Sequence, residues 1–390
     1  MKIVMLCDFY NEDLEYQENL LAKYYVKHGH EVIIITSTFE SVFDYYSDKH
    51  DNSKPMRTYH HGGARIIKLP YRFNIANRLR AYTRIDPILE EFQPDLIYVH
   101  DIMLNLPECI DYKKRHKNCR MILDYHADYS NSGKNWLSLK VLHGIARKWY
   151  LDQARPHLSK IFPIVPASAT FLNDIYDVPH AEMELLPLGA DIDLINDIRA
   201  EGSRTSLRER YGIGADQAVI FTGGKLAPAK RTELLIDALG MLSTEVHLMV
   251  IGQASESDAA YEALIKAKGS KTPNVRFTGW LGKTDIYRHL LMSDLAVFPA
   301  SQSILWQQAI ACGLPLICGD SGHQSAAYLN TANNIIIIER DNITPGSLSK
   351  SIASVIDNPA KFAEMRRGAN KVATEVLDWN ILINKTLRFN

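Results

Sequence analysis

The stretch Ala218-Val-Ile-Phe-Thr-Gly-Gly-Lys-Leu-Ala-Pro-Ala-Lys230 puts a glycine turn and two lysines directly after an apolar run. The apolar run predicts a buried strand, and apolar residues at helical spacing after Thr232 predict an amphipathic helix packed on a sheet. The glycines let the chain turn sharply and bring backbone N–H groups close to an anion, while Lys225 and Lys230 add positive charge. The stretch therefore predicts a diphosphate site in an α/β fold. The alternative is an ordinary strand-to-helix turn with solvated lysines.

A second element of the same kind follows about eighty residues later. Residues 294–299 predict a strand, a helical pattern begins at Ser303, and Gly313 and Pro315 end it before another apolar strand. Ser303 is the expected N-cap, and the free N–H groups of such a helix attract anions at the carboxyl edge of a parallel sheet. Two anion sites in one half of the chain indicate a bound nucleoside diphosphate.

Strand-like runs alternate with helical patterns along the whole chain. They lie at 31–36, 65–69, 95–99, 120–124 and 161–165, and again at 218–222, 246–251, 274–278, 294–298, 314–318 and 334–338. Alternation of this kind predicts doubly wound parallel sheets, and 390 residues suit two domains better than one core. The polar, glycine-containing stretch 41–63 is expected to be a loop excursion.

At this point the chain resembles the retaining family 4 glycosyltransferases of the GT-B fold. Their signature pairs a Gly-Arg-x4-Lys loop with Glu-x7-Glu before Ala-x-Ala-Cys-Gly-x-Pro, and further matches are Gly29-His-Glu-Val, Asp95-Leu-Ile-Tyr-Val-His-Asp101, Leu186-Pro-Leu-Gly-Ala-Asp191 and Asn274-Val-Arg-Phe-Thr-Gly-Trp280. The resemblance implies two Rossmann-like α/β domains facing a central cleft. It assigns 1–190 to the acceptor and 191–377 to the nucleotide-sugar donor, and it predicts that a tail, 378–390, crosses back to the first domain.

The implied reaction moves a sugar, with retention of configuration, from a nucleotide-diphosphate sugar to a surface polysaccharide or lipid-linked glycan. A UDP-sugar is the family's common donor. Negative charge on the departing diphosphate must be stabilised, and the two lysines and the helix at Ser303 are suited to that task. The expected donor-binding residues are Gly223, Gly224, Lys225, Lys230, Trp280, Leu281, Ser301, Gln302, Ser303, Ile304, Leu305, Gln307 and Gln308.

This chain departs from the signature at three places. Lys225 stands where the family has arginine, and a lysine binds phosphate as a point charge rather than as a bidentate fork. Gln308 aligns with the second glutamate, which in the family holds the ribose hydroxyls, and Gln307 is a close second candidate. The first glutamate has no counterpart, which leaves Ser301, Gln302 and Ser303 as neutral contacts. The loop at Trp280 and Leu281 is the expected base contact, although Trp280 equally suits the core.

In the first half, His126 follows a predicted strand and matches the family's active-site histidine, which contacts the donor sugar. With Lys225 and Lys230 it completes the expected catalytic set. Other polar residues are expected at the same sheet edge on the acceptor side, and for each a purely structural role is an equal alternative; they are Tyr16, Gln17, Asn19, His100 and Asp101.

No metal and no other cofactor is expected, because the lysines already supply charge for the diphosphate. Asp191-Ile-Asp193 has the Asp-x-Asp form of a metal-binding pair, but it lies in the predicted interdomain segment and is interpreted as structural. The cysteines, at 7, 109, 119, 312 and 318, show no metal-binding spacing and fit reduced thiols in the cytosol.

Charge and hydropathy exclude some classes of partner and location for this protein. The net charge of −1 argues against a nucleic-acid binder, and the absence of a run of about eighteen apolar residues argues against a membrane span. Residues 65–84 hold six Lys or Arg and no acid, and residues 113–160 hold eleven against three acids. Trp136, Leu137, Val141, Ile145 and Trp149 make the second stretch amphipathic, which suits reversible contact with an anionic membrane; a solvated helix with a buried apolar stripe is the alternative.

The sequence therefore predicts a cytoplasmic glycosyltransferase, working at the inner face of the cell membrane. Two alternatives stay open. One, suggested by the loss of both signature glutamates, is a non-catalytic nucleotide-sugar-binding partner subunit. The other is a nucleotide-sugar hydrolase or epimerase of the same fold.

Overall fold

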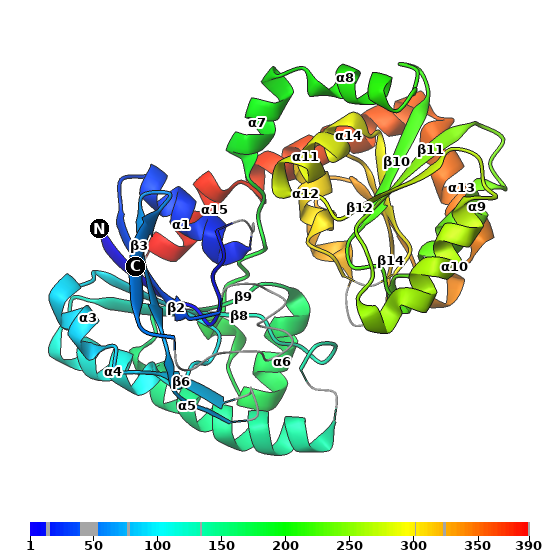
Figure 1. Cartoon of the computed structure of the whole chain (residues 1–390). Coiled ribbons are helices and arrows are strands. Elements are labelled where there is room, and N and C mark those ends of the chain that lie inside the picture. The colour runs from blue at the N-terminus through cyan, green and yellow to red at the C-terminus, as the bar shows by residue number, and fades with distance from the viewer. Residues whose placement is uncertain are drawn as a thin grey trace. The chain divides into compact units, whose positions relative to one another are not determined.

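The computed structural model describes residues 1–12, 16–39, 54–75, 79–132, 135–300, 302–322 and 325–388. The chain forms two compact units, one of Met1–Pro187 with Leu382–Asn390 and the other of Leu188–Ile381 (Figure 1). Each unit is a parallel sheet flanked by helices, so the predicted pair of Rossmann-like domains is confirmed.

The first unit is built on a seven-stranded sheet of order β3-β4-β2-β1-β7-β8-β9. Its strands are β1 (Lys2–Leu6), β2 (Glu31–Ser37), β3 (Arg57–His61), β4 (Ala64–Leu69), β7 (Leu96–His100), β8 (Arg120–Tyr125) and β9 (Lys160–Pro163). All neighbours pair in parallel except β3, which runs antiparallel to β4. The prediction of a loop over 41–63 is wrong for Arg57–His61, which form strand β3. Residues 41–53 lie outside the described residues.

The helices of the first unit include α1 (Gln17–Lys27), α3 (Asp86–Phe92), α4 (Leu106–Arg115), the π-helix η1 (Ser138–Arg147), α5 (Lys148–Ala154) and α6 (Pro166–Tyr176), with η2 (Arg155–His157) and η3 (His180–Glu182) as single 3-10 turns. A separate hairpin joins β5 (Tyr71–Ile75) to β6 (Leu79–Tyr82). The last helix, α15 (Trp379–Leu387), packs its end in this unit, where Thr386 Oγ1 lies 2.5 Å from the Tyr25 hydroxyl.

The second unit has a six-stranded, all-parallel sheet of order β12-β11-β10-β13-β14-β15. Its strands are β10 (Ala218–Gly223), β11 (Val246–Ile251), β12 (Val275–Gly279), β13 (Leu295–Phe298), β14 (Leu316–Gly319) and β15 (Ile335–Ile338). Side chains alternate between two cores: Val219 and Phe221 enter one, and Ile220 enters the other. Burial on both faces explains why these strands are continuous apolar runs in the sequence.

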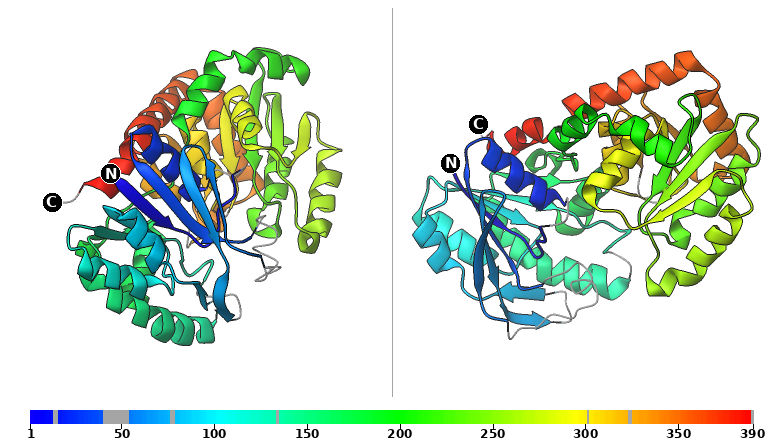
Figure 2. Two further views of the ribbon diagram at one scale, coloured as in Figure 1. Left: turned by 60° about the vertical axis from the view of Figure 1, so that its left-hand side comes forward. Right: turned by 45° about the horizontal axis from the view of Figure 1, so that its top comes forward.

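Helices cover both faces of this second sheet, as Figures 1 and 2 show. They are α7 (Ile192–Ala200), α8 (Ser203–Arg210), α9 (Thr232–Leu239), α10 (Ala259–Gly269), α11 (Lys283–Met292), α12 (Leu305–Ala311), α13 (Pro345–Ile356) and α14 (Pro359–Glu375), with 3-10 turns η4 (Pro228–Lys230), η5 (Glu256–Asp258), η6 (Ala326–Leu329) and η7 (Arg340–Asn342). The predicted N-cap at Ser303 is wrong, because α12 begins at Leu305 with Ile304 as its N-cap. No helix in the described ranges is long and apolar enough to cross a bilayer.

Candidate active site

Glycines close the carboxyl edge of the second sheet at the ends of β10 and β11. A Cβ on Gly223 would lie 2.5 Å from the carbonyl oxygen of Ile251, and a Cβ on Gly252 would lie 2.1 Å from that of Gly224. Gly224 and Gly252 also have φ of 110° and 111°, a region that favours glycine. The two strand ends therefore approach each other so closely that only glycine fits beside the lysine-bearing loop, and the Gly224 N–H donates to the carbonyl oxygen of Ile251 at 3.0 Å.

The two lysines of this loop have different environments. Lys230 is half-buried, and its Nζ donates to the carbonyl oxygen of Gln302 at 2.5 Å, so it links the loop after β10 to the loop after β13. Lys225 is exposed, and its Nζ lies 3.2 Å from a carboxylate oxygen of Asp258. Lys230 is thus fixed at the strand edge, whereas Lys225 has to leave a surface ion pair before it contacts a ligand.

The segment before α12 supplies backbone more than side chains. Ser301 lies outside the described residues. Ser303 Oγ accepts from Leu305 N at 3.3 Å, Ile304 is half-buried and Leu305 is buried. Because α12 has only seven residues, its dipole adds little, and the case for an anion site rests on the lysines and the glycine loop.

The structure separates the two glutamine candidates. Gln307 is fully buried, and its amide oxygen accepts from the Tyr328 hydroxyl at 2.8 Å while its nitrogen donates to the carbonyls of Ser303 and Ile304, each at 3.2 Å. Gln308 is also buried, but its Oε1 has no hydrogen-bond partner among the described residues. A buried amide oxygen without a donor is costly, so Gln308 is the one suited to accept from a ligand hydroxyl.

Trp280 follows β12 at the same edge of the sheet. Its side chain is 57% exposed, so the core alternative for Trp280 is wrong. Gly252 N donates to the carbonyl oxygen of Gly279 at 2.8 Å, which ties this loop to the end of β11. Leu281 is half-buried and packs against the second-unit core. An exposed indole beside the glycine loop is available for stacking on a base.

Burial lowers the pKa of Lys230 to about 8. A bound diphosphate favours the charged form, so binding should take up a proton wherever free Lys230 is neutral. We expect nucleoside diphosphate affinity to fall as the pH rises through about 8, where free Lys230 loses its proton. Calorimetry in buffers of different ionisation enthalpy will measure both the affinity and the proton uptake. An unchanged affinity up to pH 9 in wild type, or the same fall in Lys230→Arg, would contradict this assignment.

In the first unit, the buried carboxylate of Asp124 contacts both candidate histidines, His100 and His126. Asp124 Oδ2 lies 3.1 Å from His100 Nδ1 and 3.2 Å from His126 Nε2, and it accepts from the Tyr98 hydroxyl at 2.7 Å. Asp101, with φ of 61°, accepts from His126 N at 3.1 Å through Oδ1. These residues end the adjacent strands β7 and β8, so parallel pairing brings them together.

The charges of this cluster follow from burial and proximity. Burial by itself would lower the pKa of His100, but the charge of Asp124 and its hydrogen bond outweigh burial and raise the pKa to about 10. Burial would raise the pKa of Asp124, and the two histidines hold it well below its usual range instead. His100 is therefore an imidazolium and Asp124 a carboxylate at neutral pH.

The start of α1 adds two buried polar groups to the same edge. Gln17 Nε2 donates to the Tyr98 hydroxyl at 3.3 Å, and Glu18 is buried with its pKa raised, chiefly by that burial. Asn19 Nδ2 donates to the carbonyl oxygen of Asn11 at 2.9 Å, and Tyr16 is the partly exposed N-cap. Gln17 thus joins the Asp124 cluster, and Asn19 holds the loop before α1.

Sequence reasoning missed Asp124, Tyr98 and Glu18. Asp124 and Tyr98 lie within strands, where the sequence predicts only core. The signal that could have found Asp124 is that an acid inside an apolar strand, two residues before the candidate His126, needs a partner.

Two groups of residues, one with histidines and one with aspartates, are relevant to metal binding. His100, Asp124 and His126 offer ligand atoms within 4.8 Å of one another, which is compatible with a metal ion. Asp191 is buried and caps α7, its side chain accepting from Leu194 N at 3.2 Å, which agrees with a structural role.

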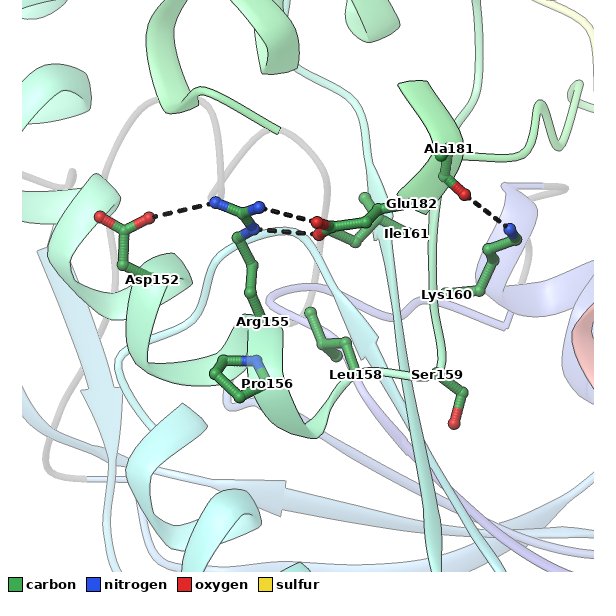
Figure 3. A pocket seen from close by; sticks show the side chains of 9 residues that line it. All are labelled: Asp152, Arg155, Pro156, Leu158, Ser159, Lys160, Ile161, Ala181 and Glu182. Carbon is green, nitrogen blue, oxygen red and sulfur yellow. Dashed lines mark hydrogen bonds and ion pairs between the residues drawn. The ribbon is translucent and has the colours of Figure 1, made fainter. Parts of the chain in front are cut away.

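Two pockets lie at the opposite, amino edges of the sheets. The pocket in Figure 3, of about 580 Å³, lies beside the start of β9, where Arg155 pairs with Glu182 at 2.8 Å and Lys160 donates to the Ala181 carbonyl oxygen at 3.2 Å. A pocket of about 320 Å³ in the second unit is lined by residues that precede β13 and β14. Neither includes the loops at the carboxyl edges, so neither is the candidate site.

Both halves of the chain match known family models. Residues 19–194 match the model described as Glycosyltransferase Family 4, and residues 203–373 match Glycosyl transferases group 1. A GDP-mannose-dependent monoacylated alpha-(1-6)-phosphatidylinositol monomannoside mannosyltransferase of Corynebacterium glutamicum is 24% identical over 217 residues, 52% of this chain and 54% of that protein. A D-inositol 3-phosphate glycosyltransferase of Xylanimonas cellulosilytica is 25% identical over 222 residues, 53% of this chain and 50% of that protein. The chain thus spans about half the length of these curated relatives.

Solved structures agree on the fold. The structure titled Anabaena Alr3699/HepE in complex with UDP covers 99% of both chains with a TM-score of 0.69 and 18% identity. WaaG, titled a glycosyltransferase involved in lipopolysaccharide biosynthesis, covers 98% of both with a TM-score of 0.64 and 17% identity. Each half of the chain thus matches a glycosyltransferase family model, and the chain shares the two-domain GT-B fold of these neighbours.

Proposed function

We propose that this protein transfers a sugar, with retention of configuration, from a nucleotide-diphosphate sugar to a glycan or lipid-linked acceptor. The observation that carries the proposal is Lys230, held at the strand edge by the carbonyl oxygen of Gln302 beside a loop that only glycine can form. Fixed donors aimed at developing charge stabilise a departing diphosphate without reorganisation. The second unit is proposed to bind the donor, and the first unit the acceptor.

The side chains divide the work as follows. Lys230, with Lys225 after release from Asp258, neutralises the diphosphate. The Gln308 amide oxygen accepts from the ribose, and Trp280 covers the base. His126, oriented by Asp124 and Asp101, is proposed to contact the donor sugar, a role that rests on the family resemblance. We propose that the lysines make a metal unnecessary for transfer.

Removing the Gln308 acceptor should remove recognition of the ribose. We expect Gln308→Leu to weaken UDP binding roughly two- to tenfold, as for the loss of one hydrogen bond. The variant should also bind UDP and its analogue without ribose hydroxyls equally well, whereas wild type prefers UDP. Calorimetry with both ligands measures this. Gln307→Leu is the matched control: it loses the Tyr328 contact and should lower thermal stability while keeping the preference for UDP. A preference retained in Gln308→Leu would exclude Gln308 from ribose binding.

The relatives suggest candidate substrates. Two mannosyltransferases are named as dependent on GDP-mannose and acting on phosphatidylinositol monomannosides, and the HepE structures hold UDP, glucose or UDP-glucose. We propose a UDP-sugar as donor, with GDP-sugars as its main competitor, and a cytoplasmic site of action.

The proposal is tested first by binding and then by turnover. Thermal stabilisation by UDP, GDP, dTDP and their sugars identifies the donor, and product analysis by NMR with and without acceptor glycolipids identifies the reaction and the anomeric outcome. Transfer that survives a chelator supports the metal-free proposal, and activity lost to a chelator and restored by magnesium or manganese refutes it. Donor consumption without acceptor would favour hydrolysis or epimerisation. Binding without any turnover, in the presence of varied acceptors, would favour the partner-subunit alternative.

A further inference from the structure

A row of large apolar side chains is exposed along one helix of the first unit. Leu137, Val141, Ile145 and Trp149 recur at every fourth position and are 62%, 42%, 66% and 56% exposed, and Trp136 beside them is 69% exposed. We call these five residues the apolar stripe. Single exposed apolar residues are normal, but five large ones along one helix indicate a surface that meets something other than water.

The helix geometry keeps the apolar stripe on one side. Residues Ser138–Arg147 are a π-helix that continues without a break into α5, as Figure 1 shows. A π-helix has more residues per turn than the 3.6 of an α-helix, so side chains four apart stay closer to one line. A π-helical segment is rare and is frequently found at functional sites.

The opposite side of this helix already fills the core. His143 is buried, with Nδ1 2.6 Å from the Tyr176 hydroxyl, Leu151 is fully buried, and Leu139 packs on the first-unit core. The alternative reading, a solvated helix whose apolar residues face the core, therefore explains only the inner side of this helix. The exposed side carries a second apolar surface that the unit itself leaves uncovered.

The chain segment that carries the apolar stripe is basic. Residues 135–160 contain five Lys or Arg and one acid, Asp152. Lys140 is exposed and has no ion-pair partner among the described residues. Lys148 pairs with Asp152 at 3.3 Å and Asp177 at 3.2 Å, and Arg155 pairs with Glu182, so Lys140 is the clearest free cation beside the stripe.

We propose that the apolar stripe docks on an anionic lipid membrane, with the helix lying in the interface. Tryptophans at both ends, aliphatic residues between them and a flanking lysine have the composition of interfacial helices. Indole rings favour the boundary between headgroups and acyl chains, and anionic headgroups attract lysine. A second copy fits less well, since a two-fold contact through the stripe would bring the two Lys140 side chains together.

Vesicle flotation tests this inference. Vesicles of phosphatidylcholine alone and of phosphatidylcholine with phosphatidylglycerol are compared at low and high salt, using wild type, Trp136→Ser/Ile145→Ser/Trp149→Ser and Lys140→Glu. The matched control is Met241→Ser/Leu264→Ser, which removes two exposed apolar side chains, 62% and 48% exposed, from the second unit. Size-exclusion chromatography with light scattering is run on every variant without lipid.

Wild type and the control should bind the anionic vesicles, with a blue shift of tryptophan emission, and bind neutral vesicles less. The triple variant should bind at least tenfold more weakly, as for the loss of buried large apolar side chains, and Lys140→Glu should bind roughly fivefold or more weakly. Equal binding to both vesicle types, equal binding by the triple variant, or a wild-type dimer that the triple variant abolishes would overturn the inference. The inference does not rest on the proposed function. Thermal stabilisation of the same samples by nucleotides tests the donor site, and vesicle flotation tests only membrane binding.

Discussion

Lys230→Ala is expected to lower kcat/KM for sugar transfer roughly ten- to a hundredfold. A hydrogen bond from a charged group is worth roughly 1.5–3 kcal/mol, and each 1.4 kcal/mol corresponds to about a factor of ten. Lys230 is half-buried and already positioned by the Gln302 carbonyl oxygen, so little ordering is needed when the diphosphate binds. If the contact tightens as charge develops on the leaving group, the loss appears in kcat rather than in KM alone.

The comparison variants make the Lys230 result specific. Lys225→Ala should have a smaller effect, because Lys225 is exposed and must first leave Asp258. Lys371→Ala, which removes an exposed lysine of α14, should leave transfer unchanged. The Lys230 ammonium also holds the Gln302 carbonyl oxygen, so the unliganded melting temperature is measured for each variant. Equal kcat/KM for Lys230→Ala and Lys371→Ala, with both proteins folded, would remove Lys230 from the donor site.

Asp124→Asn is expected to have the largest effect on the first unit, costing about 3–5 kcal/mol of local stability and most of the transfer activity. Removing one partner of a buried ion pair leaves the other charge uncompensated. Here His100 loses its carboxylate, His126 loses its orienting contact at 3.2 Å, and the Tyr98 hydroxyl loses a strong acceptor. Hydrogen exchange of the β7 and β8 amides measures the stability, and initial rates measure the transfer.

The pH dependence gives an independent check of the Asp124 cluster. In wild type the raised pKa of His100 contributes stability that is fully present below its unfolded value of about 6.5 and is lost as the pH rises through about 10. The lowered pKa of Asp124 contributes stability that is present above about 3.9 and is lost on further acidification. In Asp124→Asn the main group that raises the pKa of His100 is removed while its burial stays, so the pKa of His100 should fall, as NMR titration of the ring will show.

A surface aspartate supplies the matched control for Asp124. Asp152→Asn, which touches the half-exposed Lys148 and Arg155, should cost at most about 1 kcal/mol, because exposed ion pairs contribute little. Should Asp124→Asn resemble Asp152→Asn in both stability and rate, the buried carboxylate would be excluded as the group that positions His126.

Prediction from sequence succeeded where the signal is local and periodic. The strands of the second sheet are apolar runs because both faces are buried, and all six were predicted within a few residues of their bounds. It failed for β3, whose residues Arg57–His61 are polar and largely exposed at a sheet edge, so no alternating pattern marks them. The N-cap predicted at Ser303 was wrong by one residue: Ile304 is the N-cap, although the Ser303 hydroxyl still accepts from the first helical N–H, that of Leu305, at 3.3 Å.

The sequence by itself determined the α/β class, the glycine loop and the residue types able to bind a diphosphate, because turn chemistry and hydrophobic periodicity act over a few residues. Only the tertiary structure decided which of the two adjacent glutamines is the better ligand candidate. The Gln307 amide oxygen accepts from the hydroxyl of Tyr328, which lies in a separate turn, whereas the Gln308 amide oxygen has no partner among the described residues. The tertiary structure also decided that Asp124 lies between two histidines and that Trp136 and Trp149 face outward. These outcomes depend on strand pairing and on what covers each face of a helix, which residues far apart in the chain decide together.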